Sequence, residues 1–184
     1  MLSSYLIQPA GAIRGHINFV PEAGGIYVLL LDHPKALDPA LHRAGLKLDP
    51  LRLGGRAILY LGATDDSLRR RLKCHLSDDS ARSTFRMSLG AVLAEQLQLS
   101  ARPSGVRGFR FEPEGEARLS RWIEDHVSVA IRESGHALVE EKSLIAMQEP
   151  LLNISGRRHK TSAETMLLLR RRMRGLPFDR KVLH

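Results

Sequence analysis

The chain has one cysteine, few aromatic residues and no long hydrophobic run. A single cysteine, Cys74, excludes an intrachain disulfide, and we therefore expect a reducing, cytoplasmic setting. The longest apolar run, residues 26–31, is far shorter than the roughly 20 residues that cross a bilayer, so we expect no membrane protein. The N-terminus shows neither the basic lead nor the apolar block of a secretory signal. Aromatic residues make up 5% of the chain, too few for a base-stacking platform.

Positive charge is concentrated toward the C-terminal end. The chain carries 28 Lys and Arg against 20 Asp and Glu, a net charge of +8, and residues 155–184 alone account for +7 of it. Clustered cations neutralise backbone phosphates and release counterions, which makes nucleic acid the leading partner. A solvated helix end that only aids solubility is the alternative. The candidate contacts are Arg157, Arg158, Lys160, Arg170, Arg171, Arg172 and Arg174.

The hydrophobic pattern predicts one α+β domain. We expect strands at residues 26–31, 56–62 and 106–111, where apolar residues run together or alternate. We expect helices at about 65–76, 83–97, 116–132, 137–147 and 162–174, where apolar residues recur every three or four positions. The segment between the first two strands, about 32–55, contains three prolines and indicates a surface insertion with a short helix near 39–44. We expect residues 1–154 to form the domain and 155–184 to form a basic C-terminal extension.

A glutamate lies on the apolar face of the expected helix at 137–147. At about 100° per residue, Glu141 falls between Ala137, Leu138, Leu144 and Ile145. A carboxylate among apolar neighbours is costly to bury unless a cation or hydrogen-bond donors meet it. That cation is a divalent metal ion in one interpretation and an arginine in a structural ion pair in the other.

Arg71 and His75 lie four residues apart on the expected helix at 65–76, so they project from one face. A guanidinium binds two phosphate oxygens in a forked geometry, and an imidazole donates hydrogen bonds or moves a proton. Together they suit phosphoryl chemistry. Arginine-rich helix surfaces are common, so the pair is informative only alongside other motifs.

These residues belong to an ordered set that resembles the GIY-YIG nuclease superfamily. The first triplet is a literal match, and the second has leucine where the family has isoleucine. The spacing of the later residues, from the glutamate to the asparagine, also follows the family pattern. The set consists of Gly25-Ile26-Tyr27, Tyr60-Leu61-Gly62, Arg71, His75, Glu141, Leu144-Ile145, Pro150 and Asn153.

The resemblance implies a small three-stranded antiparallel sheet flanked by helices, and a metal-dependent endonuclease that hydrolyses phosphodiester bonds in DNA. In this interpretation Glu141 holds one Mg²⁺ or Mn²⁺ ion, Arg71 stabilises charge in the transition state, and Asn153 orients its neighbours. Arg70 is the alternative to Arg71, which lies one residue further from Tyr60 than is usual in the family.

The resemblance also implies that Tyr27 is the general base, with Tyr60 positioning the water or the phosphate and His75 assisting. A phenol has a reference pKa of about 10, so we expect positive charge on Arg71, on the metal ion and on a protonated His75 to lower the pKa of Tyr27. Ordinary strand packing is the alternative for both tyrosines. For the whole chain, the alternatives are a noncatalytic nucleic-acid-binding or interaction module that kept the fold, and a nuclease acting on RNA.

Overall fold

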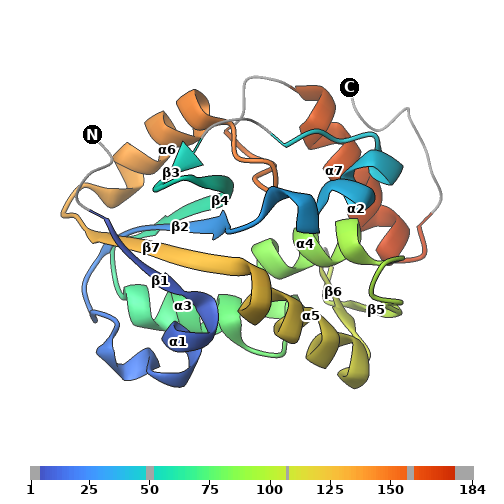
Figure 1. Ribbon diagram of the computed structural model, residues 1–184, viewed down its shortest axis with the longest axis horizontal. Helices are drawn as coiled ribbons and strands as arrows, with labels where there is room; N and C mark the ends of the chain where they lie inside the picture. The colour runs from blue at the N-terminus through green and yellow to red at the C-terminus, as the bar shows by residue number, and fades with distance from the viewer. Residues whose placement is uncertain (1–4, 49–51, 107, 157–159, 177–184) are drawn as a thin grey trace.

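The computed structural model describes residues 5–48, 52–106, 108–156 and 160–176 (Figure 1). Within these residues, a five-stranded antiparallel sheet has the strand order β1-β7-β2-β4-β3, and a separate hairpin pairs β5 with β6. The strands of the sheet are β1 (Leu6–Pro9), β2 (Gly25–Leu31), β3 (Arg52–Leu53), β4 (Arg56–Thr64) and β7 (Val127–Glu133), and those of the hairpin are β5 (Ala101–Ser104) and β6 (Gly108–Phe111).

Helices cover both faces of the sheet, and Figure 1 shows α6 on one side and α1, α3 and α5 on the other. The helices are α1 (Ala10–Gly15), α2 (Asp38–Ala44), α3 (Leu68–Leu76), α4 (Thr84–Leu93), α5 (Pro113–His126), α6 (Ala137–Gln148) and α7 (Lys160–Met173), with short 3-10 turns at Ile17–Phe19, Pro34–Ala36 and Ser80–Arg82. No helix among the described residues combines the length and hydrophobicity that a membrane span needs.

The central strand β2 separates two hydrophobic cores. Ile26, Val28 and Leu30 pack into the smaller core under α6, while Tyr27 and Leu29 pack into the larger core on the opposite face. Because β2 is buried on both faces, every one of its residues is shielded from solvent and its sequence is a continuous apolar run. The same alternation places the Tyr27 side chain on the face opposite α6.

The N-termini of α3 and α4 are fixed by serine caps. Ser67 Oγ accepts a hydrogen bond from the Arg70 amide at 3.1 Å, and Ser83 Oγ accepts one from the Arg86 amide at 3.0 Å. These bonds satisfy amides that have no partner within the helix. Starting from its cap, α3 buries Leu68, Leu72 and Leu76 as one stripe, as its periodicity predicts.

The α+β class and the antiparallel sheet flanked by helices are confirmed, but the sheet has five strands rather than the expected three, because β1 and β3 add to its edges, and the third expected strand lies elsewhere. Residues 106–111 were expected in the sheet, yet Gly108–Phe111 form β6 in the hairpin. The strand beside β2 is β7, within the segment that we expected to be helical up to residue 132. The expected helix ends at His126 because Val127, Val129 and Ile131 are β-branched and favour a strand, although Val129 and Ala130 also continue the helical period.

The remaining helices lie close to their expected positions. A short helix in the 32–55 segment is confirmed as α2, and the basic helix near the C-terminus is confirmed as α7. Helix α7 packs against α4 and buries Met166 completely. A domain boundary after residue 154 stays a prediction.

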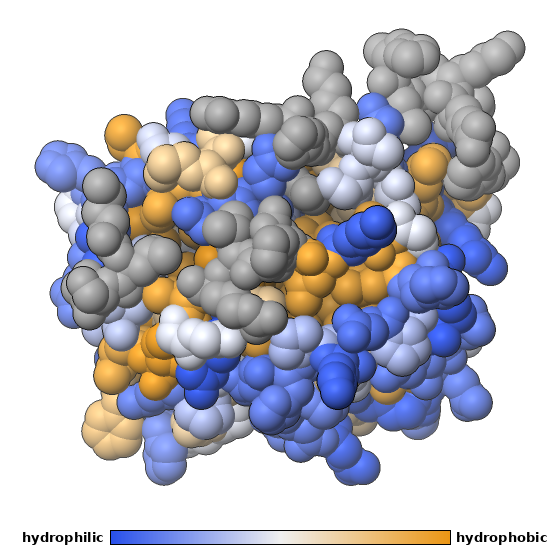
Figure 2. Space-filling model, turned by 45° about the horizontal axis from the view of Figure 1, so that its top comes forward, coloured by the Kyte–Doolittle hydropathy of each residue, from blue (hydrophilic) through white to orange (hydrophobic). Residues whose placement is uncertain are grey.

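Helix α6 is less buried than its sequence pattern predicts. It buries Ala137 and Ile145, whereas Leu138 and Val139 are 43% and 70% exposed. Figure 2 turns the side on which α6 lies toward the viewer, and hydrophobic residues are visible across the middle of that face, with hydrophilic residues along its lower margin. The expectation that Leu138 flanks Glu141 within a buried stripe is therefore wrong.

Candidate active site

The outer edge of β4 positions two polar side chains. Strand β3 pairs only with the first two residues of β4, so the edge beyond it has no neighbouring strand among the described residues. Asn153 fills part of this gap, because its Oδ1 accepts from the Leu61 amide at 2.9 Å and its Nδ2 donates to the Leu61 carbonyl at 2.8 Å. Two residues along, the Ala63 amide donates to Glu141 Oε1 at 3.1 Å. The strand edge thus holds an amide and a carboxylate side by side.

On the face of the sheet opposite α6, Tyr27 forms the centre of a hydrogen-bonded cluster. Its hydroxyl lies 2.8 Å from His75 Nε2 and accepts a hydrogen bond from Arg71 Nε at 3.3 Å. His75 Nδ1 in turn lies 2.7 Å from Ser83 Oγ, the cap of α4. Tyr27 and His75 are almost fully buried, while Arg71 is exposed to solvent. Arg70, the alternative arginine, forms an ion pair with Asp66 instead.

The second tyrosine connects this cluster to the strand edge. Strand register pairs Tyr27 with Gly62 and Leu29 with Tyr60, so the two phenols are diagonal neighbours on one face. Their ring centroids lie 6.4 Å apart, and the Tyr60 hydroxyl lies 2.9 Å from Thr84 Oγ1. The two tyrosines therefore link β2, β4 and the start of α4.

Both triplet glycines are required by close packing. The Tyr27 side chain passes directly over Gly62, so a Cβ atom on Gly62 would lie 2.2 Å from the Tyr27 hydroxyl oxygen. A Cβ on Gly25 would lie 2.4 Å from the Arg132 carbonyl oxygen and 2.7 Å from the Leu68 side chain. Contacts this short are not tolerated between heavy atoms, so the glycines allow the tyrosine and the α3 stripe to approach the sheet.

Burial dominates the protonation equilibria of the cluster. Burial raises the pKa of Tyr27, and the nearby Arg71 charge opposes this without reversing it. Burial, together with the charges of Arg71 and Arg86, lowers the pKa of His75 to about 3. The expected lowering of the Tyr27 pKa is therefore not found in the protein alone, and His75 is neutral at pH 7 rather than protonated.

Burial also raises the pKa of Glu141, while the hydrogen bond from the Ala63 amide and the charge of Arg71 act in the opposite direction. The Arg71 charge thus acts on both Tyr27 and Glu141. A carboxylate in this position gains from a cation brought beside it.

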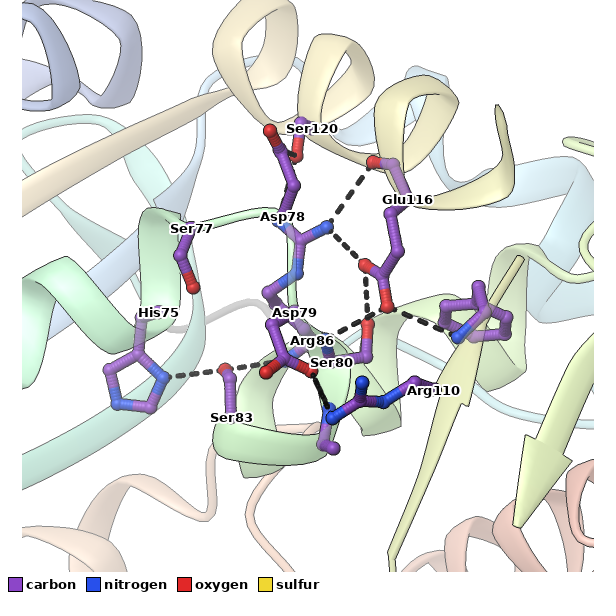
Figure 3. Close-up of polar contacts among 12 residues, drawn as sticks. His75, Ser77, Asp78, Asp79, Ser80, Ser83, Arg86, Arg110, Glu116 and Ser120 are labelled. Carbon is purple, nitrogen blue, oxygen red and sulfur yellow. Dashed lines mark hydrogen bonds and ion pairs between the residues drawn. The ribbon is translucent and has the colours of Figure 1, made fainter. Parts of the chain in front are cut away.

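Behind His75 lies a buried polar network that the sequence analysis did not identify (Figure 3). Arg86 is 0% exposed and Glu116 is 4% exposed, and they form an ion pair at 2.6 Å. Glu116 Oε2 also accepts from the Ser80 hydroxyl at 2.9 Å, and Glu116 Oε1 accepts from the Ser80 amide at 2.9 Å. Because Ser80 begins the turn that leads to Ser83, this network holds the segment that contacts His75.

A cavity of about 940 Å³ wraps around the outer edge of β4 and reaches α7. It brings together residues from β4, α4, α6, α7 and the segment before α7. The lining residues are Tyr60, Thr84, Glu141, Lys142, Ile145, Leu152, Asn153, Ile154, Ser155, Gly156, Leu167, Arg170, Arg171 and Arg174.

The described residues among the expected nucleic-acid contacts do not all lie at one place. Arg170, Arg171 and Arg174 line the cavity beside Tyr60 and Glu141, whereas Arg172 lines a second hollow between α2, α4 and α7. Lys160 begins α7. Arg157 and Arg158 lie outside the described residues.

Glu141 is the one residue that we expected to bind a metal ion. Among the described residues, no three His, Cys, Asp or Glu side chains are grouped as a metal-binding cluster. Mg²⁺ nevertheless commonly uses one or two carboxylates and completes its shell with waters and substrate phosphates. Glu141 lines the cavity, with one oxygen held by the Ala63 amide, and burial makes its charge costly without a cation. These residues fit a single divalent ion held jointly with a phosphate.

Comparison with known proteins gives one match. A family model described as the GIY-YIG catalytic domain matches residues 25–174, a range that runs from the first triplet through α7. No curated protein and no solved structure matches the chain significantly.

Proposed function

Because this chain belongs to the GIY-YIG family of nucleases, we propose that it is a metal-dependent endonuclease that hydrolyses phosphodiester bonds in DNA. One observation carries the proposal. A phenol that contacts both a neutral imidazole and a guanidinium lies beside a cavity lined by a second phenol, a carboxylate and an amide. Such a set can receive a proton, neutralise phosphoryl charge and hold a divalent ion.

Tyr27 is the proposed general base, and His75 is its proton acceptor. Neutral His75 with its proton on Nδ1 donates to Ser83 and presents a lone pair on Nε2 to the Tyr27 hydroxyl. The Tyr27 oxygen takes the proton of the attacking water while its own proton passes along the hydrogen bond to Nε2, and Arg71 Nε donates to this oxygen throughout. Because burial raises the pKa of Tyr27 and lowers the pKa of His75, a stable phenolate beside a protonated imidazole is unfavourable, and the two protons move together.

The remaining residues act on the phosphate. The exposed part of Arg71 meets the charge that develops on the phosphoryl oxygens. Tyr60 and Asn153, both lining the cavity, position the phosphate and the strand edge. Glu141 would hold the divalent ion, which supplies Lewis-acid neutralisation of phosphoryl charge when bound.

Substitution of Glu141 tests the proposal. Glu141→Gln keeps an oxygen for the Ala63 amide but removes the charge that holds a cation. We expect the wild type to cut supercoiled plasmid in Mg²⁺ or Mn²⁺ but not in EDTA, and the variant to lose at least about 100-fold in rate. Glu114→Gln, an exposed change in the first turn of α5, is the control and retains full activity. If the protein cleaves an RNA substrate faster than DNA, RNA is its substrate. If it binds nucleic acid without cleaving it, the protein is a noncatalytic module.

The basic helix is the proposed phosphate-contact element. Replacing Arg170, Arg171 and Arg172 with glutamine removes up to three phosphate contacts, and each contact contributes about 0.9 to the slope of log K against log salt for a duplex. We therefore expect a flatter salt dependence of DNA binding, measured by fluorescence anisotropy. An unchanged slope contradicts this role.

A further inference from the structure

One wall of the cavity beside Glu141 carries cations without counter-ions. Arg170 and Arg171 lie in the last turn of α7, Arg174 directly follows the end of this helix, and none of the three forms an ion pair with a described carboxylate. The Nε atoms of Arg171 and Arg174 are buried without a hydrogen-bond partner among the described residues. Arg174 Nη2 donates to the Val106 carbonyl at 2.6 Å, but no described carboxylate neutralises either guanidinium, and such cations suit an anionic ligand.

Much of the remaining cavity surface is apolar, although Thr84, Glu141, Lys142, Asn153 and Ser155 also line it. Its lining includes Ile145 from α6, Leu152 and Ile154 from the segment that follows, and Leu167 from α7, with the Tyr60 ring beside them. A surface that contacts only the sugar-phosphate backbone of a duplex is polar and positively charged. This cavity instead combines arginines for an anion with aliphatic side chains and an aromatic edge for a flat, apolar group.

A single nucleotide has both parts, and it is accessible only when unpaired. In a duplex the faces of the bases are stacked and their edges are paired, so no base can reach into a cavity of about 940 Å³. Pockets of about 300–1,000 Å³ are typical of sites that enclose a small molecule, which matches one or two nucleotides rather than a 20 Å duplex.

We propose that this cavity binds an unpaired nucleotide adjacent to the scissile phosphate, so that the enzyme acts on single-stranded DNA or on the single-stranded branch of a flap. The α7 arginines hold phosphates of the unpaired strand, and Leu167 and Ile154 contact its base. This inference rests on the proposed function, because it places the cavity next to a catalytic Glu141. In this arrangement the cavity selects which form of DNA the active site cleaves.

Oligonucleotide substrates of one sequence test the inference. A labelled 30-nucleotide single strand, its blunt duplex and a duplex carrying the same strand as a flap are incubated with the wild-type protein in Mg²⁺. We expect the single strand and the flap to be cut at least about tenfold faster than the blunt duplex. Equal or faster cleavage of the blunt duplex overturns the inference and leaves the nuclease proposal standing.

If no substrate is cut, measurements of DNA binding test the cavity assignment separately from the nuclease proposal. In EDTA, anisotropy should show tighter binding to the single strand than to the blunt duplex. Arg171→Gln should weaken single-strand binding about tenfold, as expected for the loss of a charged hydrogen bond. Leu167→Asn, at a residue that is 38% exposed, should weaken single-strand binding severalfold while leaving duplex binding unchanged. Arg121→Gln, an exposed arginine on α5 that does not line the cavity, removes the same charge as a control.

The outcomes are distinct. Preferential single-strand binding that depends on Arg171 and Leu167, without cleavage, supports the cavity assignment and contradicts the nuclease proposal. If Arg171→Gln and Arg121→Gln lose the same amount of single-strand affinity, only the net charge of the protein matters for binding, and the assignment of the cavity is overturned. If Leu167→Asn binds the single strand as tightly as the wild type does, Leu167 does not contact the base, and the assignment of the cavity is overturned as well.

Discussion

Glu116 forms a buried ion pair with Arg86, and replacing it with glutamine tests how strongly the network behind His75 is held together. Glu116 Oε2 accepts from Arg86 Nη2 at 2.6 Å and from the Ser80 hydroxyl at 2.9 Å. The other carboxylate oxygen, Oε1, accepts from the Ser80 and Phe111 amides. Glutamine can keep an oxygen toward the two amides, but its NH₂ group then faces two donors and leaves the Arg86 charge without a carboxylate.

The expected cost follows from burial. Removing one partner of a buried ion pair costs about 3–5 kcal/mol, because the other charge stays desolvated. Arg86 is 0% exposed, so water cannot solvate it without a rearrangement of α4 and α5. Against a total stability of about 5–15 kcal/mol, this loss is a large fraction of the whole. With a urea m-value of about 2 kcal/mol/M, the midpoint should fall by roughly 2 M.

Urea unfolding followed by circular dichroism measures the effect. The control is Glu95→Gln, because Glu95 is 79% exposed and pairs with Arg43 at 3.7 Å, so its loss should cost less than about 1 kcal/mol. A Glu116→Gln midpoint within 0.5 M of the wild type (roughly 1 kcal/mol), at an unchanged m-value, would refute the reasoning that the pair is desolvated and strongly coupled.

Further predictions concern the cluster around Tyr27. Tyr27→Phe should lower the cleavage rate by about 100-fold or more while leaving DNA binding intact, and retained cleavage removes Tyr27 from the base role. Gly62→Ala should displace the Tyr27 hydroxyl and cost about 1–3 kcal/mol, measured as a lower urea midpoint together with a lower kcat. Ser83→Ala should cost about 1 kcal/mol as a lost helix cap and also lower kcat, since it frees His75 Nδ1; an unchanged kcat argues against the proposed tautomer. The pKa of His75 is about 3 in the folded protein and about 6.5 in the unfolded chain. Neutral His75 therefore makes its full contribution to stability above about pH 6.5, and this contribution is lost as the pH falls toward about 3, by at most about 1.4 kcal/mol per pH unit. Stability measured from pH 7 to 4 should therefore fall more steeply in the wild type than in His75→Gln, and parallel curves would contradict this.

Strands with clear boundaries could be predicted from the sequence, and strands that follow a helix directly could not. Strands β2 and β4 are apolar runs next to glycines, and both were expected. Strand β7 starts at Val127 with no turn residue after α5, and its Val129 and Ala130 continue the three-and-four spacing of the helix. The alternation of Val127, Val129 and Ile131 was the signal for a strand.

The geometry of the cluster follows partly from local rules. Arg71 and His75 meet Tyr27 because they are one helical turn apart on α3, which packs against the sheet through the leucine stripe. The network around Glu116 depends on contacts between α4, α5 and β6, which local patterns do not specify. Glu116 does share the apolar face of α5 with Leu119, the same signal that identified Glu141.

The way in which side chains complete the outer edge of β4 has a consequence for self-association. An uncovered strand edge invites pairing with a strand of another molecule. Asn153 occupies both hydrogen-bonding groups of Leu61, and Glu141 occupies the Ala63 amide, so these two residues of the proposed active site also protect the strand edge from pairing with another molecule. Substitutions that inactivate the enzyme at Asn153 should therefore also reduce its solubility, and inactive variants should be chosen at Glu141, where glutamine keeps the edge occupied.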